Sequence, residues 1–260
     1  MVSKLDRYYE KFDEDKRLSR RHGQVEFLTS MKYIEKALAK YSSPKILDIG
    51  AGTGAYSVPL ANKGYDVTSV EVVKKNLEIL RQKQSKCKTF LADARNLEML
   101  KDEAFDVVLL FGPMYHLLEE SQKLQALLEA KRVTKCGGTI LVAYYMNEYA
   151  ILTHGFKNGA ILQSQREGRV DKNFHIVAKQ EDLYSFVRVD DIKRLAREAQ
   201  LKRQKLVATD GASDYMRQTL NQMDEQTFAE YLDFHFSICE RPELVGASSH
   251  TLDILTKQAK

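Results

Sequence analysis

Cysteine is scarce in this 260-residue chain: its three cysteines are Cys87, Cys136 and Cys239, and no two of them form a CxxC pair. Cysteines this far apart predict neither a zinc site nor a disulfide framework, and they are typical of proteins in a reducing compartment. The histidines do not change this, because no metal-ligand spacing links His154, His175 and His235. The sequence therefore predicts no metal site.

Long apolar runs are also lacking. The N-terminal segment MVSKLDRYYEKFDEDKRL is charged from its start and has no apolar stretch of the kind a signal peptide needs. The longest apolar stretch, residues 105–118, contains Asp106, His116 and a Gly-Pro break, so it is too short and too polar to span a bilayer. We therefore expect a cytoplasmic protein that does not enter a membrane.

Neither sign of charge is in large excess. The net charge is +4, the hydrophobic share 43% and the charged share 29%, which is the balance of a soluble globular protein. Nucleic-acid-binding proteins usually carry a concentrated basic stripe, which this chain lacks, so we do not expect a nucleic-acid partner. The composition gives no indication of the oligomeric state.

Apolar segments alternate with helix-like segments over the first half of the chain. The predicted strands are residues 45–49, 66–73, 87–91, 105–111 and 139–145, and the predicted helices between them are residues 54–63, 74–86 and 119–134. The fourth strand is almost wholly apolar, which is typical of a parallel strand covered on both faces. This order predicts a doubly wound, Rossmann-like α/β sheet with helices on both faces.

The rhythm changes after residue 145, where no long period continues. We expect one domain over residues 1–260, with a mostly parallel, seven-stranded sheet completed by two late strands. Its predicted parts are an N-terminal helical cap at 1–43, a core at 44–145, and lid or substrate elements at 147–185 and 212–240.

A glycine-rich turn follows the first predicted strand in the sequence PKILDIGAGTGAYS. Gly50, Gly52 and Ala55 satisfy a loose dinucleotide fingerprint, and Glu71 follows about twenty residues later. Two carboxylates argue against a dinucleotide. Asp48, inside the strand, suits a ligand with a positive group, and Asp93 can accept a hydrogen bond from an exocyclic amine.

Five blocks share their order and spacing with a known family. ILDIGAGTG, the acid Glu71, the turn at Asp93, FDVVLLFGPMYHL and KCGGTILVAYY resemble the class I S-adenosylmethionine-dependent methyltransferases over residues 44–145. RRHGQVEFLT, GPMYHL and PELVGASSHTLDI also resemble a bacterial branch of that family. The resemblance implies S-adenosylmethionine as cofactor, S-adenosylhomocysteine as product and transfer of the sulfonium methyl to a small-molecule acceptor.

The resemblance also implies a set of cofactor-binding residues: Asp48, Gly50, Gly52, Gly54, Glu71, Val72, Asp93, Ala94 and Phe111. The glycines, Asp48 and Phe111 would surround the methionine part, Glu71 would hold the ribose hydroxyls, and the others would meet the adenine. Structural roles stay open for each type of residue: a tight turn for the glycines, a helix cap or Asx-turn for the aspartates, a solvated surface for Glu71, and plain core packing for the apolar side chains.

The block GPMYHL supplies the candidate catalytic residues His116 and Tyr115. A histidine there could take a proton from the acceptor or orient it, and it could equally cap or pack beneath the next helix. The block lacks the Asp/Asn-Pro-Pro-aromatic pattern of some nucleobase and amide N-methyltransferases. That absence disfavours methylation of adenine N6 or of a glutamine amide.

The N-terminal segment offers candidates for a cap over the cofactor. Tyr9, Arg21 and His22 could close the site, as could Arg17 or Arg20, since an arginine there could pair with a carboxylate. A solvated basic helix end explains the arginines equally well. Three other functions stay open: methylation of RNA or protein, non-catalytic regulation through the same cofactor, and a nicotinamide-dependent oxidoreductase, which Asp48 and Asp93 disfavour.

Overall fold

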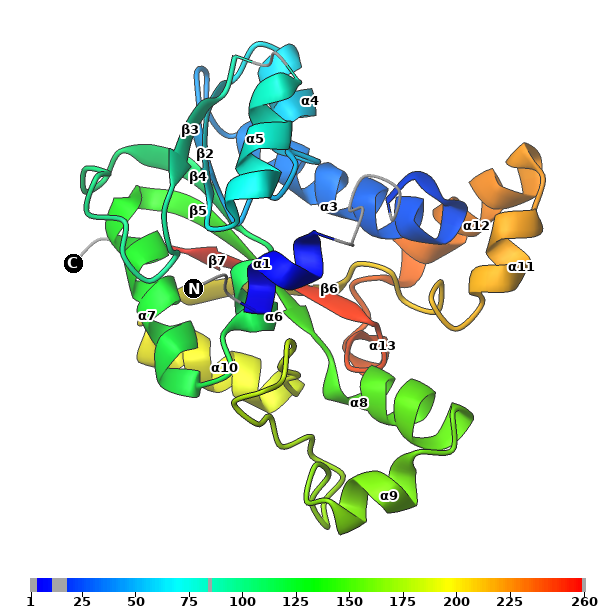
Figure 1. The fold of residues 1–260 in the computed structure, drawn as a ribbon. Helices are drawn as coiled ribbons and strands as arrows, with labels where there is room; N and C mark the ends of the chain where they lie inside the picture. The colour runs from blue at the N-terminus through cyan, green and yellow to red at the C-terminus, as the bar shows by residue number, and fades with distance from the viewer. Residues whose placement is uncertain (1–3, 11–17, 84–85, 259–260) are drawn as a thin grey trace.

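A single sheet forms the centre of the molecule. The computed structural model describes residues 4–10, 18–83 and 86–258. The seven strands lie in the order β3-β2-β1-β4-β5-β7-β6 (Figure 1). Their bounds are β1 Lys45–Ile49, β2 Asp66–Glu71, β3 Lys88–Leu91, β4 Phe105–Leu110, β5 Thr134–Tyr145, β6 Lys202–Ala208 and β7 His250–Thr256. Strands β1 to β5 pair in parallel, and β7 is antiparallel to both β5 and β6. The predicted doubly wound, mostly parallel sheet is confirmed.

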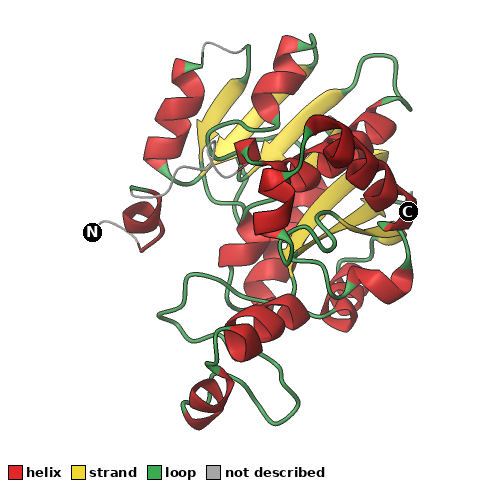
Figure 2. Cartoon of the chain, turned by 90° about the vertical axis from the view of Figure 1, so that its right-hand side faces the viewer, coloured by secondary structure: helices red, strands yellow, loops and turns green. Residues whose placement is uncertain are grey.

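Helices cover both faces of this sheet (Figure 2). The helices in the described part of the chain are α1 Lys4–Tyr9, α3 Arg21–Leu38, α4 Ser57–Asn62, α5 Lys74–Gln82, α6 Pro113–His116, α7 Glu120–Val133, α8 Asn147–Ala150, η1 Ile151–Lys157, α9 Ile161–Arg166, α10 Val189–Glu198, α11 Arg217–Gln222, α12 Glu225–Ile238 and α13 Pro242–Val245. One core cluster joins the sheet to α7 and α10, and another joins it to α3 and α4.

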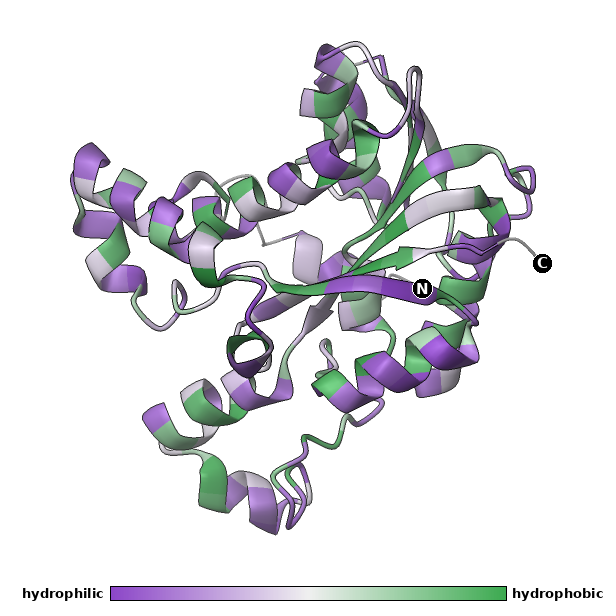
Figure 3. Cartoon of the chain, turned by 180° about the vertical axis from the view of Figure 1, so that it is seen from behind, coloured by the Kyte–Doolittle hydropathy of each residue, from purple (hydrophilic) through white to green (hydrophobic). Residues whose placement is uncertain are grey.

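The hydropathy of the strands explains their central position. Every residue of β4 is buried, as the apolar run predicts, and so is β1 after its first residue. The central strands are accordingly among the most apolar parts of the ribbon, whereas the edge strand β6 begins with hydrophilic residues and most helices carry a polar side (Figure 3). Within the described ranges, we find no helix with the length and apolar character needed to cross a membrane.

Several element boundaries differ from the prediction: β2 ends at Glu71 instead of residue 73, α5 ends at Gln82 instead of residue 86, and the starts of α4 and β5 also move. The helix expected from residue 54 begins at Ser57, because Gly50, Gly52 and Gly54 all have positive φ, which a right-handed helix does not allow. The strand expected from residue 139 begins at Thr134, which pairs with Phe105 ahead of a register shift.

Two segments, α1 and the residues around Ser185, lie near the carboxyl ends of the strands. Helices α8, η1 and α9 extend away from the sheet in both views (Figures 1 and 2), and the chain then returns to the sheet. On that return, the Ser185 N–H donates to the Tyr115 carbonyl at 2.7 Å. Helix α1 lies beside α5, and Lys75 Nζ donates to the Tyr9 carbonyl at 3.2 Å. Both segments therefore border the same region of the sheet.

Candidate functional site

A cavity of about 1050 Å³ opens at the carboxyl ends of β1, β2 and β4. Strand order reverses at β1, because β2 and β4 lie on its two sides, and such switch points are where doubly wound sheets bind ligands. All the predicted cofactor residues except Gly54 line this cavity, as do Tyr9, His22, Tyr115 and His116. The sequence thus identified residues that the fold brings together.

Gly50 and Gly52 form the floor of the turn. Gly50 has a φ of 78°, and a Cβ added there would lie 2.4 Å from Cδ of Pro113. Glycine is therefore required at this position for two reasons, the left-handed backbone and the close approach of the GPMYHL block. The Gly52 N–H donates to Glu71 Oε2 at 2.7 Å, which fixes the turn against the end of β2.

Gly54 has a different role from the other two glycines. It does not line the cavity, and its φ is 89°. A Cβ at this position would lie 2.2 Å from Cδ1 of Leu80 and 2.8 Å from Cγ2 of Val58. Gly54 thus allows α4 and α5 to pack together behind the loop.

Asp48 lies at the inner end of the cavity with only 1% of its surface exposed. The Ser57 hydroxyl donates to its carboxylate, and the Ser69 hydroxyl donates to Ser57 Oγ at 2.9 Å. Burial raises the pKa of Asp48 to about 6, with a smaller contribution from the nearby charge of Glu71. Asp48 therefore both holds the start of α4, through Ser57, and presents a carboxyl group to the cavity.

The Glu71 carboxylate ties together two parts of the cavity wall. Besides Gly52, it accepts from the Val73 N–H at 2.7 Å through Oε1. Its neighbour Val72 is 47% exposed and lines the cavity, so this side chain is not part of the core. An exposed valine beside a fixed carboxylate can cover a flat ring while the acid binds polar groups next to it.

The third strand contributes Asp93 and Ala94 through the turn that follows it. Asp93 forms a bidentate pair with Arg95, with an Arg95 Nη2 to Asp93 Oδ2 distance of 2.6 Å, and it also accepts from the Arg95 N–H. The Arg95 guanidinium holds the pKa of Asp93 below its ordinary value. The Asx-type bond is the structural role that the sequence left open, and Asp93 lines the cavity as well.

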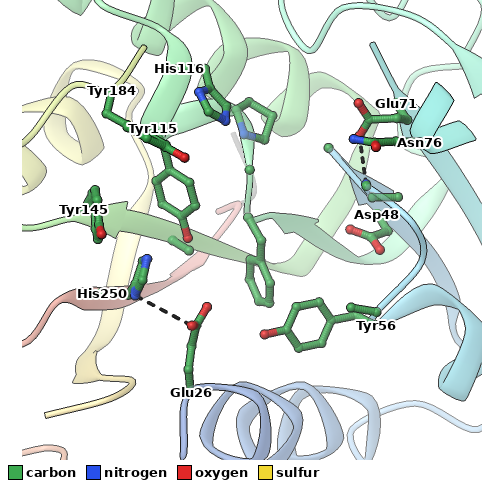
Figure 4. Close-up of a pocket in the computed structure, with 18 of the residues that line it drawn as sticks. Glu26, Asp48, Tyr56, Glu71, Asn76, Tyr115, His116, Tyr145, Tyr184 and His250 are labelled. Carbon is green, nitrogen blue, oxygen red and sulfur yellow. Dashed lines mark hydrogen bonds and ion pairs between the residues drawn. The ribbon is translucent and has the colours of Figure 1, made fainter. Parts of the chain in front are cut away.

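Aromatic side chains form much of the remaining wall. Phe111, at the end of β4, is buried and meets Tyr56 edge to face, with ring centroids 5.0 Å apart. Figure 4 places Tyr56 between Asp48 and Glu26, and it places Tyr115 between His116 and His250. The cavity therefore runs from the glycine turn to a second, aromatic end.

His116 connects α1 to residues 183–185, where the chain returns to the sheet after α9. Its Nδ1 lies 2.9 Å from the Leu183 carbonyl, so Nδ1 must donate, and Nε2 then accepts from the Tyr9 hydroxyl at 3.1 Å. Burial lowers the pKa of His116, which favours the neutral ring. A second bond nearby, from Tyr184 to Tyr8 at 2.8 Å, joins the same two segments.

The cap candidates divide between the cavity and the surface around it. His22 lines the cavity and its Nδ1 is 3.0 Å from Asn221 Oδ1. Arg20 also lines it, whereas Arg21 is outside the lining and lies over the Phe228 ring at 5.6 Å from the centroid. Arg17 falls outside the residues that the structure describes.

Three buried residues at the aromatic end were not predicted: Glu26, Asp210 and His250. His250 Nδ1 lies 2.7 Å from Asp210 Oδ2 and 3.7 Å from Glu26 Oε2. Asp210 follows β6 and His250 begins β7, so the antiparallel pairing of these strands brings them together. The histidine at the start of the last predicted strand was the one sign of this cluster in the sequence. Its partners could not be predicted, because they depend on the pairing of β6 with β7, which the local sequence does not show.

Comparison with known proteins agrees with this geometry. A family model described as a methyltransferase domain matches residues 47–142. The glycine/sarcosine N-methyltransferase of Aphanothece halophytica is 32% identical over 132 residues, 49% of each chain. The demethylmenaquinone methyltransferase of Renibacterium salmoninarum is 30% identical over 115 residues, 44% of this chain and 46% of the relative. The chain thus spans about half the length of these curated relatives.

A solved structure extends the likeness in fold to nearly the whole chain. A methyltransferase from Thermotoga maritima, described as a possible histamine N-methyltransferase, superimposes with a TM-score of 0.58 over 98% of both chains, at 19% identity. That identity supports the fold alone. The matched domain, the relatives and the glycine turn at the strand-order switch point agree: residues 47–142 form a methyltransferase domain of the class I S-adenosylmethionine-dependent kind, whose cofactor is S-adenosylmethionine.

Proposed function

We propose that the protein transfers the sulfonium methyl group of S-adenosylmethionine to a small-molecule acceptor. The observation that carries this proposal is the continuous cavity of about 1050 Å³, which joins the glycine turn to an aromatic, polar end. Small-molecule sites usually measure about 300–1,000 Å³, so this cavity has room for a cofactor and an acceptor together. The glycine/sarcosine and demethylmenaquinone methyltransferases named above also act on small molecules.

The residues around the turn fit the chemistry of this cofactor. Gly50 and Gly52 let the backbone approach a ligand closely, and we assign them to the methionine part together with Asp48 and Phe111. We assign Glu71 to the ribose hydroxyls, because its carboxylate is fixed by two backbone N–H groups. The exposed Val72, with Asp93 and Ala94, would contact the adenine.

The protein's own contribution to catalysis is orientation and exclusion of water. S-adenosylmethionine supplies an electrophilic methyl group, and in-line displacement needs an acceptor lone pair held at the correct angle. Tyr115 and His116 line the same cavity, and we assign them to the side that holds the acceptor. Because Nε2 of His116 faces the Tyr9 hydroxyl, an acceptor could reach this nitrogen only by displacing Tyr9. His116 can therefore act as the base predicted from the sequence only for an acceptor that displaces Tyr9.

Ligand-induced stabilisation tests the cofactor assignment directly. S-adenosylhomocysteine at about 100 times its Kd should stabilise the fold by about 2.7 kcal/mol and raise the Tm by roughly 5–10 °C. NADH at the same concentration should leave the Tm unchanged. A rise with NADH and none with S-adenosylhomocysteine would overturn the proposal.

Turnover separates the remaining functions. Formation of S-adenosylhomocysteine in the presence of a small-molecule library would support the proposed reaction. Cofactor binding without turnover on any acceptor would indicate a regulatory protein. Turnover on RNA, with affinity that falls steeply as salt rises, would indicate a nucleic-acid substrate instead.

A further inference from the structure

The aromatic end of the cavity combines a histidine, two carboxylates and several rings. Glu26 and Asp210 are 7% and 2% exposed, and their carboxylates flank Nδ1 of one imidazole, that of His250. All three side chains line the cavity, and Figure 4 shows Glu26 and His250 on the side away from Glu71 and Asn76. This end is therefore separate from Glu71, the residue assigned to the ribose.

The hydrogen bonds around Asp210 fix the orientation of the imidazole. Asp210 Oδ1 accepts from the His250 backbone N–H at 2.9 Å and from the Ser248 hydroxyl at 2.5 Å. Oδ2 accepts from His250 Nδ1 at 2.7 Å. Because Nδ1 donates to the carboxylate, the neutral ring keeps its proton-accepting lone pair on Nε2, and the carboxylate stabilises the ring when it becomes positively charged.

The walls of this end favour a cation. The Tyr145 ring stacks on His250 with centroids 4.5 Å apart, and the Tyr115 ring lies 5.5 Å from His250. Aromatic faces and ionised carboxylates both attract ammonium groups, and two carboxylates around one imidazole repel an anion. The guanidinium of Arg217, which also lines the cavity, lies 3.1 Å from a third carboxylate, that of Asp214.

A buried hydroxyl at the same end indicates that a polar ligand belongs there. Thr209 lines the cavity and is 1% exposed, and within the described residues its Oγ1 has no hydrogen-bond partner. Buried hydroxyl groups are normally paired, so an unpaired one beside a cavity suits a ligand that carries N–H or O–H groups.

We propose that this end binds the methyl acceptor and that the acceptor is an amine. The ammonium form binds beside Glu26 and against the tyrosine rings, and His250 Nε2 then takes one of its protons. The freed nitrogen lone pair forms the N–CH₃ bond as the CH₃–S bond breaks, and the electrons of that bond go to sulfur, giving neutral S-adenosylhomocysteine. The methylated product carries the positive charge that the sulfonium lost, and the imidazolium releases its proton to solvent.

His250 suits this step better than His116 for an electrostatic reason. The partners of His116 are a carbonyl and a phenol, which carry no charge, and burial lowers its pKa. The imidazolium of His250 would instead face the Asp210 carboxylate. The proposal rests on the methyltransferase function, so its test uses protein already loaded with S-adenosylhomocysteine, and failure of that loading would count against the function itself.

The first experiment compares ligands of one shape and different charge. Primary amines from ethylamine to 2-phenylethylamine are each titrated against the alcohol of the same carbon skeleton, by calorimetry on the loaded protein. We expect at least one amine to bind at least about 10-fold more tightly than its alcohol. Equal binding within every pair, or no binding by any amine, would overturn the proposal, and neither result depends on a variant.

Substitution then locates the contact. Glu26→Gln should weaken the binding of that amine at least about 10-fold and leave S-adenosylhomocysteine affinity within about 2-fold. Glu35→Gln is the matched control, because Glu35 lies on the same helix, α3, and pairs with Lys63 at the surface. Unchanged amine binding by Glu26→Gln would contradict the assignment.

Two further measurements complete the test. With the tightest amine at saturation, His250→Asn should slow single-turnover methylation at least about 100-fold without changing amine Kd. Equal turnover by this variant would remove the proton-accepting role.

Zn²⁺ and Mg²⁺ are titrated alone, because Glu26, Asp210 and His250 also have the geometry of a metal site. A metal-induced rise in Tm that His250→Asn abolishes would overturn the proposal and indicate that this end binds a metal ion instead of an amine.

Discussion

Glu71 shows how one side chain can serve both the shape of the loop and the ligand. Each oxygen of its carboxylate accepts from one backbone N–H, that of Gly52 or of Val73. These bonds hold the glycine turn and the exposed Val72 in fixed positions on the same cavity. A carboxylate already ordered by the protein loses little freedom when it binds a hydroxyl group, which favours tight binding.

Replacing Glu71 with Ala should therefore weaken cofactor binding strongly. The change removes two charge-assisted bonds within the loop as well as the proposed ribose contact, so we expect S-adenosylhomocysteine Kd to rise at least about 10-fold. Calorimetry measures this directly. Asp66→Asn is the matched control, because Asp66 begins the same strand and pairs with Lys88 away from the cavity. Equal affinity of Glu71→Ala and wild type would show that Glu71 contacts no ligand.

Asp48 should make stability depend on pH. Its pKa is about 6 in the folded protein, whereas the ordinary pKa of a solvated aspartate is 3.8. Well below pH 3.8 the carboxyl is protonated in the folded and the unfolded chain alike, so its burial adds no charge-related cost to folding. As pH rises from 3.8 to 6 the unfolded carboxyl is ionised while the folded carboxyl stays largely protonated, so stability falls, by a total of about 3 kcal/mol above pH 6.

The variant Asp48→Asn isolates this effect. Without its ligand, the variant should gain on the wild type as pH rises from 4 to 6 and keep a constant advantage above pH 6, in urea unfolding followed by circular dichroism. The Ser57 contact with Asp48 makes some loss at low pH expected, so the informative quantity is the change with pH. A difference between the two proteins that does not vary from pH 4 to 7 would contradict the raised pKa.

At the scale of elements, Gly54 couples two helices that stand behind the cofactor loop. The space around it is closed by Leu80 of α5 and Val58 of α4. Gly64, at the end of α4, has a similar φ of 93°, but a Cβ there would meet no atom within 4 Å. The two glycines therefore share backbone strain and differ in packing.

Paired alanine substitutions should separate these contributions. Gly64→Ala should cost about 1 kcal/mol, the penalty for a left-handed alanine. Gly54→Ala adds overpacking of about 1–3 kcal/mol, so we expect a total of about 2–4 kcal/mol in urea unfolding. Equal losses in the two variants would show that Leu80 and Val58 move aside freely.

The sequence predicted the elements well because their signals are local. The apolar run of β4 and the glycines of the turn can be recognised from neighbours within a few residues. Such local signals predicted the order of strands along the chain and the residues on one side of the cavity. Glu26, Asp210 and His250 were missed because they lie on α3, after β6 and at the start of β7, which are far apart in the sequence and meet only in the folded chain. Asp210 and His250 are 40 positions apart and join through antiparallel β6 and β7.

At the scale of the whole molecule, two segments close the cavity from the same side. The Tyr9 hydroxyl donates to His116, and Tyr184, within the returning residues 183–185, donates to Tyr8. Tyr8, Tyr9, His116 and Tyr184 all line the cavity. A ligand that fills the cavity should thus order α1 and the returning segment together, because each is held partly by the other.

Hydrogen exchange with and without S-adenosylhomocysteine tests this arrangement. Amides at 50–53, 71–73 and 93–95 should exchange more slowly with the ligand, because they border the carboxyl ends of β1, β2 and β3. Amides of α1 and of residues 183–185 should slow together.

Amides at 202–205 serve as the internal control, because β6 begins at the opposite edge of the sheet, where Lys202 pairs with Thr256. Slowing that is equal at 202–205 would indicate general stabilisation. Slowing of the loops without α1 would separate cofactor binding from closure, and the Tyr9–His116 bond would then have no part in enclosing the acceptor.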